Sequence, residues 1–263
     1  MARSSACRPL FVSVIRTLNT MDKALLITIT AGALIVAGIG AWFFVAQMAI
    51  GKHVRGPFPV SSLLIFVVTS SLTALQFMDT DVLSSLQRNA GDLSDGRFWK
   101  LVTPLFVQGD GATGAIVNTI TFLLVAPVAE RVYGRRRMLL MYFIPGLIGQ
   151  AVGFLWDTPG AGNSVAIAGL IGGFLALELV HAHRLPQAAR GLAVVGLIAA
   201  LLLTLLSELH GPPLLAGAVL GYVLNHVSPM LPHHVDHRSA PTSVDTPVHA
   251  IRSAPSDPRS SAS

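Results

Sequence analysis

Two polar residues, Ser164 and His210, each stand where the chain enters an apolar stretch. Ser164 lies near the start of GNSVAIAGLIGGFLALEL, and His210 begins HGPPLLAGAVLGYVL. A serine hydroxyl becomes a nucleophile when a base removes its proton, and a neutral imidazole is suited to that task. If these stretches span a membrane, the chain crosses it twice between the two residues and returns them to the same face. The pair therefore indicates nucleophilic chemistry at one membrane surface.

Other polar groups could assist this pair. Glu208 precedes His210 by two residues and Asp157 lies in the loop before Ser164, but neither is clearly placed to orient the imidazole. We therefore expect a Ser–His dyad rather than a triad. Asn118 lies near the outer end of its own apolar stretch. Its amide, together with backbone N–H groups at the helix start, could bind a developing oxyanion.

The composition is that of a membrane protein. Of 263 residues, 52% are hydrophobic and 12% are charged, whereas soluble domains carry about 25% charged residues. A helix of about 20 residues spans the bilayer core. We expect an all-α polytopic protein with seven apolar segments, at Leu25–Ile50, Ser61–Met78, Thr113–Ala129, Met138–Trp156, Ser164–Ala182, Gly191–Leu206 and Pro213–Val227.

The basic residues predict the orientation of these segments. The net charge of +5 could suggest a nucleic-acid partner, but the Lys and Arg residues form short clusters between apolar blocks. We therefore expect no nucleic-acid partner and interpret the clusters as signals of membrane topology. If the side with more Lys and Arg residues faces the cytoplasm, Asn118, Ser164 and His210 lie in the outer half of the membrane. The single cysteine, Cys7, rules out an intrachain disulfide.

Four regions are expected along the chain. Residues 1–23 form an N-terminal extension, with Met21 as a possible alternative start, and residues 24–58 form an extra transmembrane helix and a cytoplasmic turn. Residues 59–230 form the transmembrane core. Its mixed connection at 79–112 is expected to insert partly into the membrane interface. The polar tail at 231–263 is expected to be disordered.

From Ser61 to Val227 the chain resembles the rhomboid family of intramembrane serine proteases. The motifs occur in the family's order: FWKLVTP from Phe98 resembles its Trp-Arg motif, Asn118 matches its oxyanion-site Asn, and GNSVAIAGLIGG is similar to its Gly-x-Ser-Gly motif. His210 with the following LLAGAVLG matches the catalytic His and the helix-packing sequence after it. The resemblance implies a six-helix core preceded by one additional helix.

The same resemblance implies a function. Ser164 would be the nucleophile, His210 the base and Asn118 an oxyanion donor, in an enzyme of the bacterial inner membrane. It would cleave transmembrane protein substrates in the lipid bilayer near the outer face, with no cofactor and no metal.

Several positions depart from the family pattern. Gly114 stands where the family has a His of the oxyanion site, Val165 follows the nucleophile in place of Gly, and Pro213 replaces another Gly. Ala168 stands where an aromatic residue often stacks on the histidine, and Lys100 replaces Arg. These departures bear on activity rather than on fold.

Alternative interpretations remain open. Ser164 also suits a helix N-cap, Asn118 a helix–helix hydrogen bond and Trp99 an aromatic-belt anchor. The main alternative function is a catalytically inactive rhomboid-like protein that binds transmembrane helices. A small transporter is less well supported, because Glu178 is nearly the only ionisable residue in the inner halves of the segments.

Overall fold

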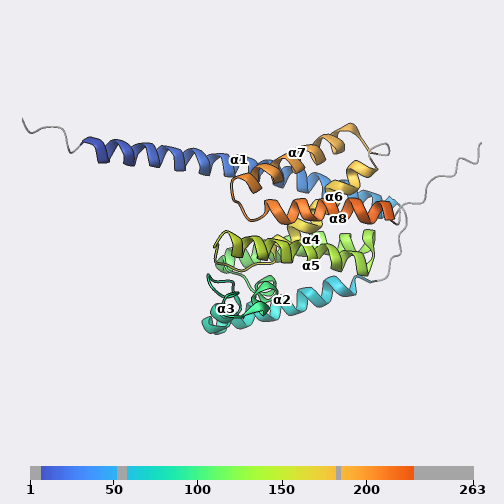
Figure 1. Cartoon of the computed structure of the whole chain (residues 1–263). Helices are drawn as coiled ribbons and strands as arrows, with labels where there is room; N and C mark the ends of the chain where they lie inside the picture. The colour runs from blue at the N-terminus through green and yellow to red at the C-terminus, as the bar shows by residue number, and fades with distance from the viewer. Residues whose placement is uncertain (1–6, 52–57, 182–184, 228–263) are drawn as a thin grey trace, which may run out of the picture. The chain divides into compact units, whose positions relative to one another are not determined.

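The computed structural model describes residues 7–51, 58–181 and 185–227, and these residues form helices joined by short connections (Figure 1). The helices are α1 (Cys7–Gly51), α2 (Val60–Met78), α3 (Thr80–Leu86), α4 (Gly111–Tyr133), α5 (Arg135–Leu155), α6 (Ser164–Val180), α7 (Gln187–Leu205) and α8 (Gly211–Val227), with short 3-10 helices η1 (Phe98–Leu101) and η2 (Thr103–Phe106). The described residues contain no strand, only a single antiparallel bridge between Arg88 and Gly160. The predicted all-α fold is confirmed.

The helices have the length and composition of membrane spans. Five are long and apolar enough to cross a bilayer, namely α1 over Asp22–Gln47, α2, α4, α5 and α7. Helices α6 and α8 are shorter, with 17 residues each, which is near the lower limit for a transmembrane helix. Large apolar side chains such as Ile120 and Leu205 are exposed on the outer surfaces of the bundle. The orientation relative to the two sides of a membrane stays a prediction.

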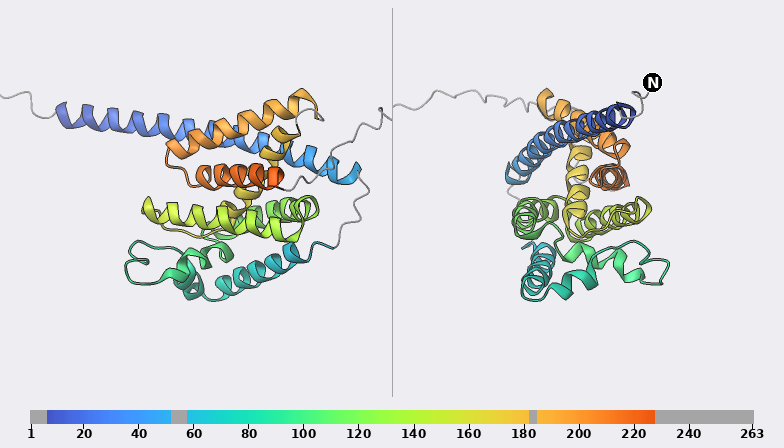
Figure 2. Two further views of the ribbon diagram at one scale, coloured as in Figure 1. Left: turned by 45° about the vertical axis from the view of Figure 1, so that its right-hand side comes forward. Right: turned by 90° about the vertical axis from the view of Figure 1, so that its left-hand side faces the viewer.

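Helix α6 lies at the centre of the bundle. It contacts α1, α4, α5, α7 and α8, and the right-hand view of Figure 2 shows it, in yellow, running between α4 on one side and α5 and α8 on the other. Most of its residues from Val165 to Glu178 are buried. A helix that is apolar on every side is suited to this position, because no face has to meet solvent. The helix that begins with Ser164 is thus the core of the fold.

The additional helix α1 packs against α7, α6 and α4. A Cβ on Gly196 of α7 would lie 3.0 Å from the Cβ of Ala37, so small residues bring these two helices close together. Trp42 Nε1 donates a hydrogen bond of 2.7 Å to the backbone oxygen of Leu124 in α4. Helix α1 begins at Cys7 and therefore also runs through residues that we had assigned to the extension at 1–23.

A buried carboxylate joins α4 to the start of α2. Glu130 accepts hydrogen bonds from the backbone N–H groups of Ser61, at 3.0 Å, and Ser62, at 2.7 Å. The hydroxyl of Ser62 also donates to it, at 2.8 Å. The first N–H groups of a helix have no partner within the helix. Glu130 supplies that partner from a helix far along the chain, and α4 continues to Tyr133, beyond the predicted end at Ala129.

The connection between α3 and α4 is folded around buried charges. Lys100 Nζ lies 3.4 Å from the carboxylate of Asp92, and both side chains are almost fully buried. Phe98 and Trp99 beside them are more than half exposed. Such exposed aromatic residues suit a membrane interface, although partial insertion of this connection stays a prediction. The proposed disorder of the tail at 231–263 concerns residues outside the described ranges.

Candidate active site

Ser164 is the first residue of α6 and is partly exposed. The loop before it is held by the connection that precedes α4. The backbone N–H of Gly162 donates to the oxygen of Pro104 at 2.8 Å, and that of Gly109 donates to Ala161 at 3.1 Å. Within the described chain, no hydrogen bond uses the N–H groups of Ser164 or Val165. These free donors at a helix start are suited to stabilise an oxyanion.

Helices α6 and α8 run in the same direction, with their axes inclined to each other, and touch through their backbones. A Cβ on Gly217 would lie 2.0 Å from the oxygen of Gly169, and a Cβ on Gly221 would lie 2.9 Å from the Cα of Gly173. Both pairs have the same separation in sequence. This constant register brings the start of α6 beside the start of α8.

The first turns of both helices also meet at one residue of α5. A Cβ on Gly149 would lie 3.0 Å from the Cβ of Val165 and 3.3 Å from the Cγ of Pro213. Ser164 immediately precedes Val165, and His210 lies three residues before Pro213, so the structure brings both to the same end of the bundle. Among the described residues, no hydrogen bond joins Ser164 to His210.

The same contact accounts for two departures from the family pattern. Val165 is buried, and its branched side chain faces the position in α5 where Gly149 has no side chain. Pro213 packs against the same position. The bulk added after the nucleophile and after the histidine is therefore accommodated by a glycine on a third helix.

His210 has a carboxylate partner. Its Nδ1 lies 2.7 Å from Glu208 Oε1, and its backbone N–H donates to Glu208 Oε2 at 2.9 Å. A carboxylate only accepts hydrogen bonds at neutral pH, so Nδ1 must carry a proton and Nε2 is the nitrogen free to act as a base. The expectation that no acid is placed to orient His210 is wrong for Glu208. The imidazole is partly exposed, with 42% of its side-chain surface accessible.

Asn118 belongs to a buried network of amides. Its Nδ2 donates to Gln108 Oε1 at 2.7 Å, and Gln108 Nε2 donates to Asn163 Oδ1 at 3.1 Å. Gln76 of α2 is bonded in turn to both backbone groups of Gln108. The network joins Asn118 to Asn163, the residue immediately before Ser164.

Ser164 and Asn118 border the same small space. A Cβ built on Gly162 would lie 3.5 Å from Ser164 Oγ and 3.7 Å from Asn118 Nδ2. One proton of the Asn118 amide is bonded to Gln108, and the other is available to a ligand. The space in front of Gly162 is where a carbonyl group could meet a hydroxyl and an amide donor together.

The position of the missing family histidine is partly filled by an acid. A Cβ on Gly114 would lie 2.3 Å from the Cβ of Asp110, so the side chain of Asp110 occupies the space beside Gly114. A carboxylate cannot replace a hydrogen-bond donor to an oxyanion while it is ionised. The structure therefore offers Asn118 and backbone N–H groups as the oxyanion donors.

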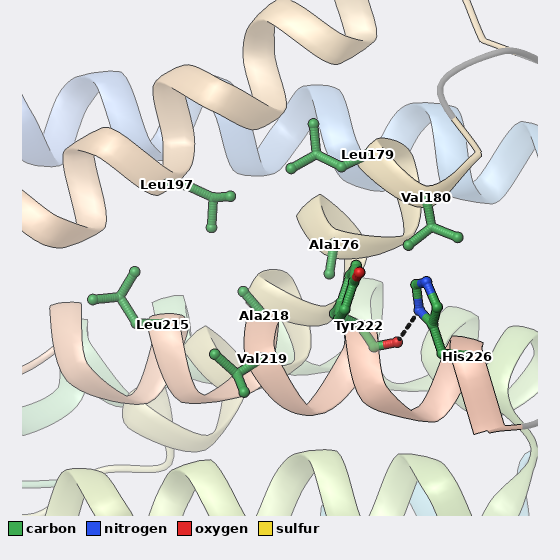
Figure 3. A pocket seen from close by; sticks show the side chains of 9 residues that line it. All are labelled: Ala176, Leu179, Val180, Leu197, Leu215, Ala218, Val219, Tyr222 and His226. Atoms are coloured by element: carbon green, nitrogen blue, oxygen red, sulfur yellow. Dashed lines mark hydrogen bonds between the residues drawn. The ribbon is translucent and has the colours of Figure 1, made fainter.

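A hollow elsewhere in the bundle is separate from this site. It measures about 660 Å³ and lies along α6, α7 and α8 (Figure 3). Its lining residues are Ala176, Leu179, Val180, Leu197, Leu215, Ala218, Val219, Tyr222 and His226. Most of them belong to the ends of α6 and α8 opposite to Ser164 and His210. The hollow is almost entirely apolar and holds none of the residues that could carry the chemistry.

Comparison with known proteins identifies the family. The rhomboid domain model matches residues 95–227, which is about half of the chain. The YdcA protein of Bacillus subtilis, named as a candidate rhomboid protease, is 29% identical over 119 residues, covering 44% of this chain and 59% of YdcA. The rhomboid protease GluP of Bacillus subtilis is 34% identical over 88 residues, covering 33% of this chain and 17% of GluP.

The chain therefore belongs to the rhomboid family, and it is a multi-pass integral membrane protein. The matched region contains Asn118, Ser164 and His210. The chain aligns with less than two thirds of the length of either Bacillus relative.

Sequence reasoning missed one residue at this site and misjudged the role of another. Gln108 is almost fully buried and connects Asn118 to Asn163, yet in the sequence it is one amide at the end of a loop. Glu208 was noticed, but its contact with His210 depends on the shape of a short turn. Its position two residues before His210 is the signal that the sequence offers for Glu208, and the sequence offers no comparable signal for Gln108.

A methyl group in front of Ser164 should block the site. Gly162→Ala places its Cβ between Ser164 Oγ and Asn118 Nδ2, and we expect at least about a 100-fold slower reaction with a fluorophosphonate probe, since loss of one oxyanion donor alone costs about 10²–10³-fold. Gly160→Ala is the matched control. Gly160 has the same φ of 150°, but its Cβ would meet only Arg88 Nη2, at 3.9 Å.

Both variants place a side chain at the same unfavourable φ, so we expect a similar loss of folded protein from this cause. The labelling rate per folded molecule should fall in Gly162→Ala and change little in Gly160→Ala. Equal rates in the two variants would show that the space in front of Gly162 is not used.

Proposed function

We propose that this protein is an intramembrane serine endopeptidase of the bacterial inner membrane that cleaves transmembrane segments near the outer face. The observation that carries the proposal is the parallel, backbone-to-backbone packing of α6 and α8, which brings Ser164 and His210 to one end of the bundle. The family membership supports the same conclusion. The rhomboid protease GluP is a relative by sequence.

The reaction follows from the groups present. His210 Nε2 takes the proton of Ser164 Oγ as the oxygen attacks the carbonyl carbon of the scissile peptide bond. The resulting oxyanion is stabilised by Asn118 Nδ2 and by the free N–H groups at the start of α6. His210 then gives the proton to the leaving amine. Water, activated by His210 in the same way, hydrolyses the acyl-enzyme and restores Ser164.

The experiment that tests this function is chemical labelling. A fluorophosphonate probe reacts with a serine only when a base has activated its hydroxyl. Added to membranes that contain the full-length protein, it is expected to form one adduct, located by mass spectrometry on Ser164. No adduct, or an adduct on another serine only, would contradict the proposal.

One observation favours the catalytically inactive alternative. Asp110 fills the space beside Gly114, where a further oxyanion donor would be expected by resemblance to the family. If the site is inactive for this reason, the protein would bind transmembrane helices without cleaving them. It would then bind the same partners in the wild type and in Ser164→Ala, with no cleavage product from either.

A further inference from the structure

The carboxylate of Glu208 contacts His210 in two places. One oxygen lies 2.7 Å from the ring Nδ1, and the other accepts the backbone N–H at 2.9 Å. The two contacts fix both the backbone and the ring of the same residue. The backbone bond holds the carboxylate in place, and the ring bond then orients the imidazole through Nδ1.

The turn that carries Glu208 has a defined shape. Helix α7 ends with a hydrogen bond from the N–H of Glu208 to the oxygen of Leu203, at 2.8 Å, and one from Ser207 to Thr204, at 3.1 Å. Ser207 has a φ of 59°, in the left-handed region that commonly ends a helix with this bonding pattern. The turn therefore directs Glu208 away from the α7 axis and toward His210.

The other side of the turn is held by α8. A Cβ on Gly211, the first residue of α8, would lie 2.4 Å from Thr204 Oγ1 and 2.6 Å from the oxygen of Ala200. Only a glycine allows α8 to begin so close to the last turns of α7. His210 thus stands between two helices that contact each other directly.

We propose that Glu208 is a positioning residue of the reaction, so that the catalytic unit is Ser164–His210–Glu208 rather than a dyad. This inference rests on the proposed function. Glu208 accepts the Nδ1–H bond, which keeps the lone pair on Nε2, the nitrogen that takes the Ser164 proton. When the imidazole becomes positively charged, the carboxylate stabilises it. Glu208 stays ionised throughout, and no proton passes to it.

The charges near His210 support this role. Burial lowers the pKa of His210, but the hydrogen bond and charge of Glu208, with a smaller contribution from the charge of Asp110, outweigh it and raise the pKa above its ordinary value. The base must be neutral to accept a proton. Activity should therefore be lost as the pH falls through this raised pKa. The acidic limb of the pH profile should lie at a higher pH than that of a histidine without a carboxylate partner.

The decisive variant is Glu208→Gln, which keeps the shape of the side chain and removes its charge. The rate of fluorophosphonate labelling is measured against pH in the full-length protein. We expect the acidic limb to move to lower pH, because the neutral imidazole is then favoured. We expect the rate at the alkaline plateau to fall about tenfold or more, since general-base assistance contributes about 10²–10⁴-fold in all.

Two control variants separate positioning from the shape of the turn. Ser207→Gly changes the neighbouring residue, keeps the left-handed conformation and leaves the carboxylate in place, so its pH profile should match the wild type. Asp110→Asn removes a charge that acts on His210 from a distance and leaves the hydrogen bond between Glu208 and the imidazole in place. It should move the acidic limb less than Glu208→Gln does. A Glu208→Gln profile with its limb at the wild-type pH would overturn the proposal.

A second measurement does not depend on activity. The titration of His210 is followed by NMR of the histidine-labelled protein, with His210→Asn to assign the signal. Glu208→Gln should titrate at a lower pH than the wild type, and Ser207→Gly should not. An unchanged titration would contradict the Glu208 inference even if the protein is labelled normally. A shifted titration without any labelling would leave the contact standing and contradict the proposed function.

Discussion

Ser164→Ala and His210→Ala are each expected to reduce fluorophosphonate labelling to background, a loss of roughly 10⁴-fold or more. The two residues act in one step, so removal of either leaves the other without a role. Ser164→Ala removes the atom that attacks. His210→Ala leaves a hydroxyl whose proton no base can take. The rate of adduct formation in membranes measures both effects.

Matched controls come from the same residue types. Ser85 of α3 is exposed, and within the described ranges its hydroxyl bonds only to the oxygen of Val82 in its own helix. His226 lies at the opposite end of α8, with its ring bonded to the oxygen of Tyr222. Ser85→Ala and His226→Ala should label like the wild type. If Ser164→Ala were still labelled, or if His210→Ala kept the wild-type rate, the proposed mechanism would be wrong.

Gly217→Ala is expected to destabilise the folded protein by at least about 2–3 kcal/mol. The added methyl group would lie 2.0 Å from the oxygen of Gly169 and 2.7 Å from its Cα. These are backbone atoms of the central helix, so the clash is relieved only when α6 and α8 move apart. Overpacking of a core typically costs about 1–3 kcal/mol, and a rigid contact lies at the upper end. The measurement is thermal unfolding in detergent.

The control is a glycine with open space around it. Gly191 in α7 is exposed, and a Cβ there would meet nothing within 4 Å. Gly191→Ala should keep or slightly raise the unfolding temperature, because alanine is the better helix former by about 1 kcal/mol. A wild-type unfolding temperature for Gly217→Ala would show that the two helices are not packed at backbone contact. The placement of Ser164 and His210 at the same end of the bundle would then be in doubt, because it depends on that contact.

The fold could be predicted from the sequence because its signals are local. Long apolar segments specify membrane-spanning helices regardless of what they pack against. The predicted ends of the helices were less accurate. Helix α4 runs to Tyr133, four residues past the predicted end, because Glu130 bonds to the start of α2 and the hydroxyl of Tyr133 donates to the oxygen of Gly173 at 2.6 Å. Such tertiary bonds leave no trace in local hydrophobicity.

The candidate site was predictable in part. Counting membrane crossings suggested that Ser164 and His210 share a face, and the parallel packing of α6 and α8 gives a structural reason. Their catalytic roles, and that of Asn118, stay predictions. The contact of Glu208 could not be foreseen, because it depends on a left-handed conformation at Ser207, which a non-glycine residue rarely adopts. Gln108 is similar, since its three hydrogen-bond partners, Gln76, Asn118 and Asn163, come from separate parts of the chain.

The departures from the family pattern are better understood in three dimensions. Val165 and Pro213 share the space above Gly149 and leave the packing of α6 on α8 intact. Lys100, where the family has Arg, is buried in an ion pair with Asp92, so one positive charge still holds the connection together. Gly114 differs from these, because Asp110 rather than a hydrogen-bond donor lies beside it.

Ser164, His210 and Asn118 are expected to form one reacting centre. The most direct measurement is an experimental structure of the full-length protein after reaction with a fluorophosphonate. Phosphorus should be bonded to Ser164 Oγ, with its oxygen within about 3.2 Å of Asn118 Nδ2. His210 should keep its Nδ1 on Glu208 and face the adduct with Nε2. An adduct on Ser164 with His210 beyond the reach of a side-chain rotation, or no adduct on Ser164 at all, would contradict a shared reacting centre.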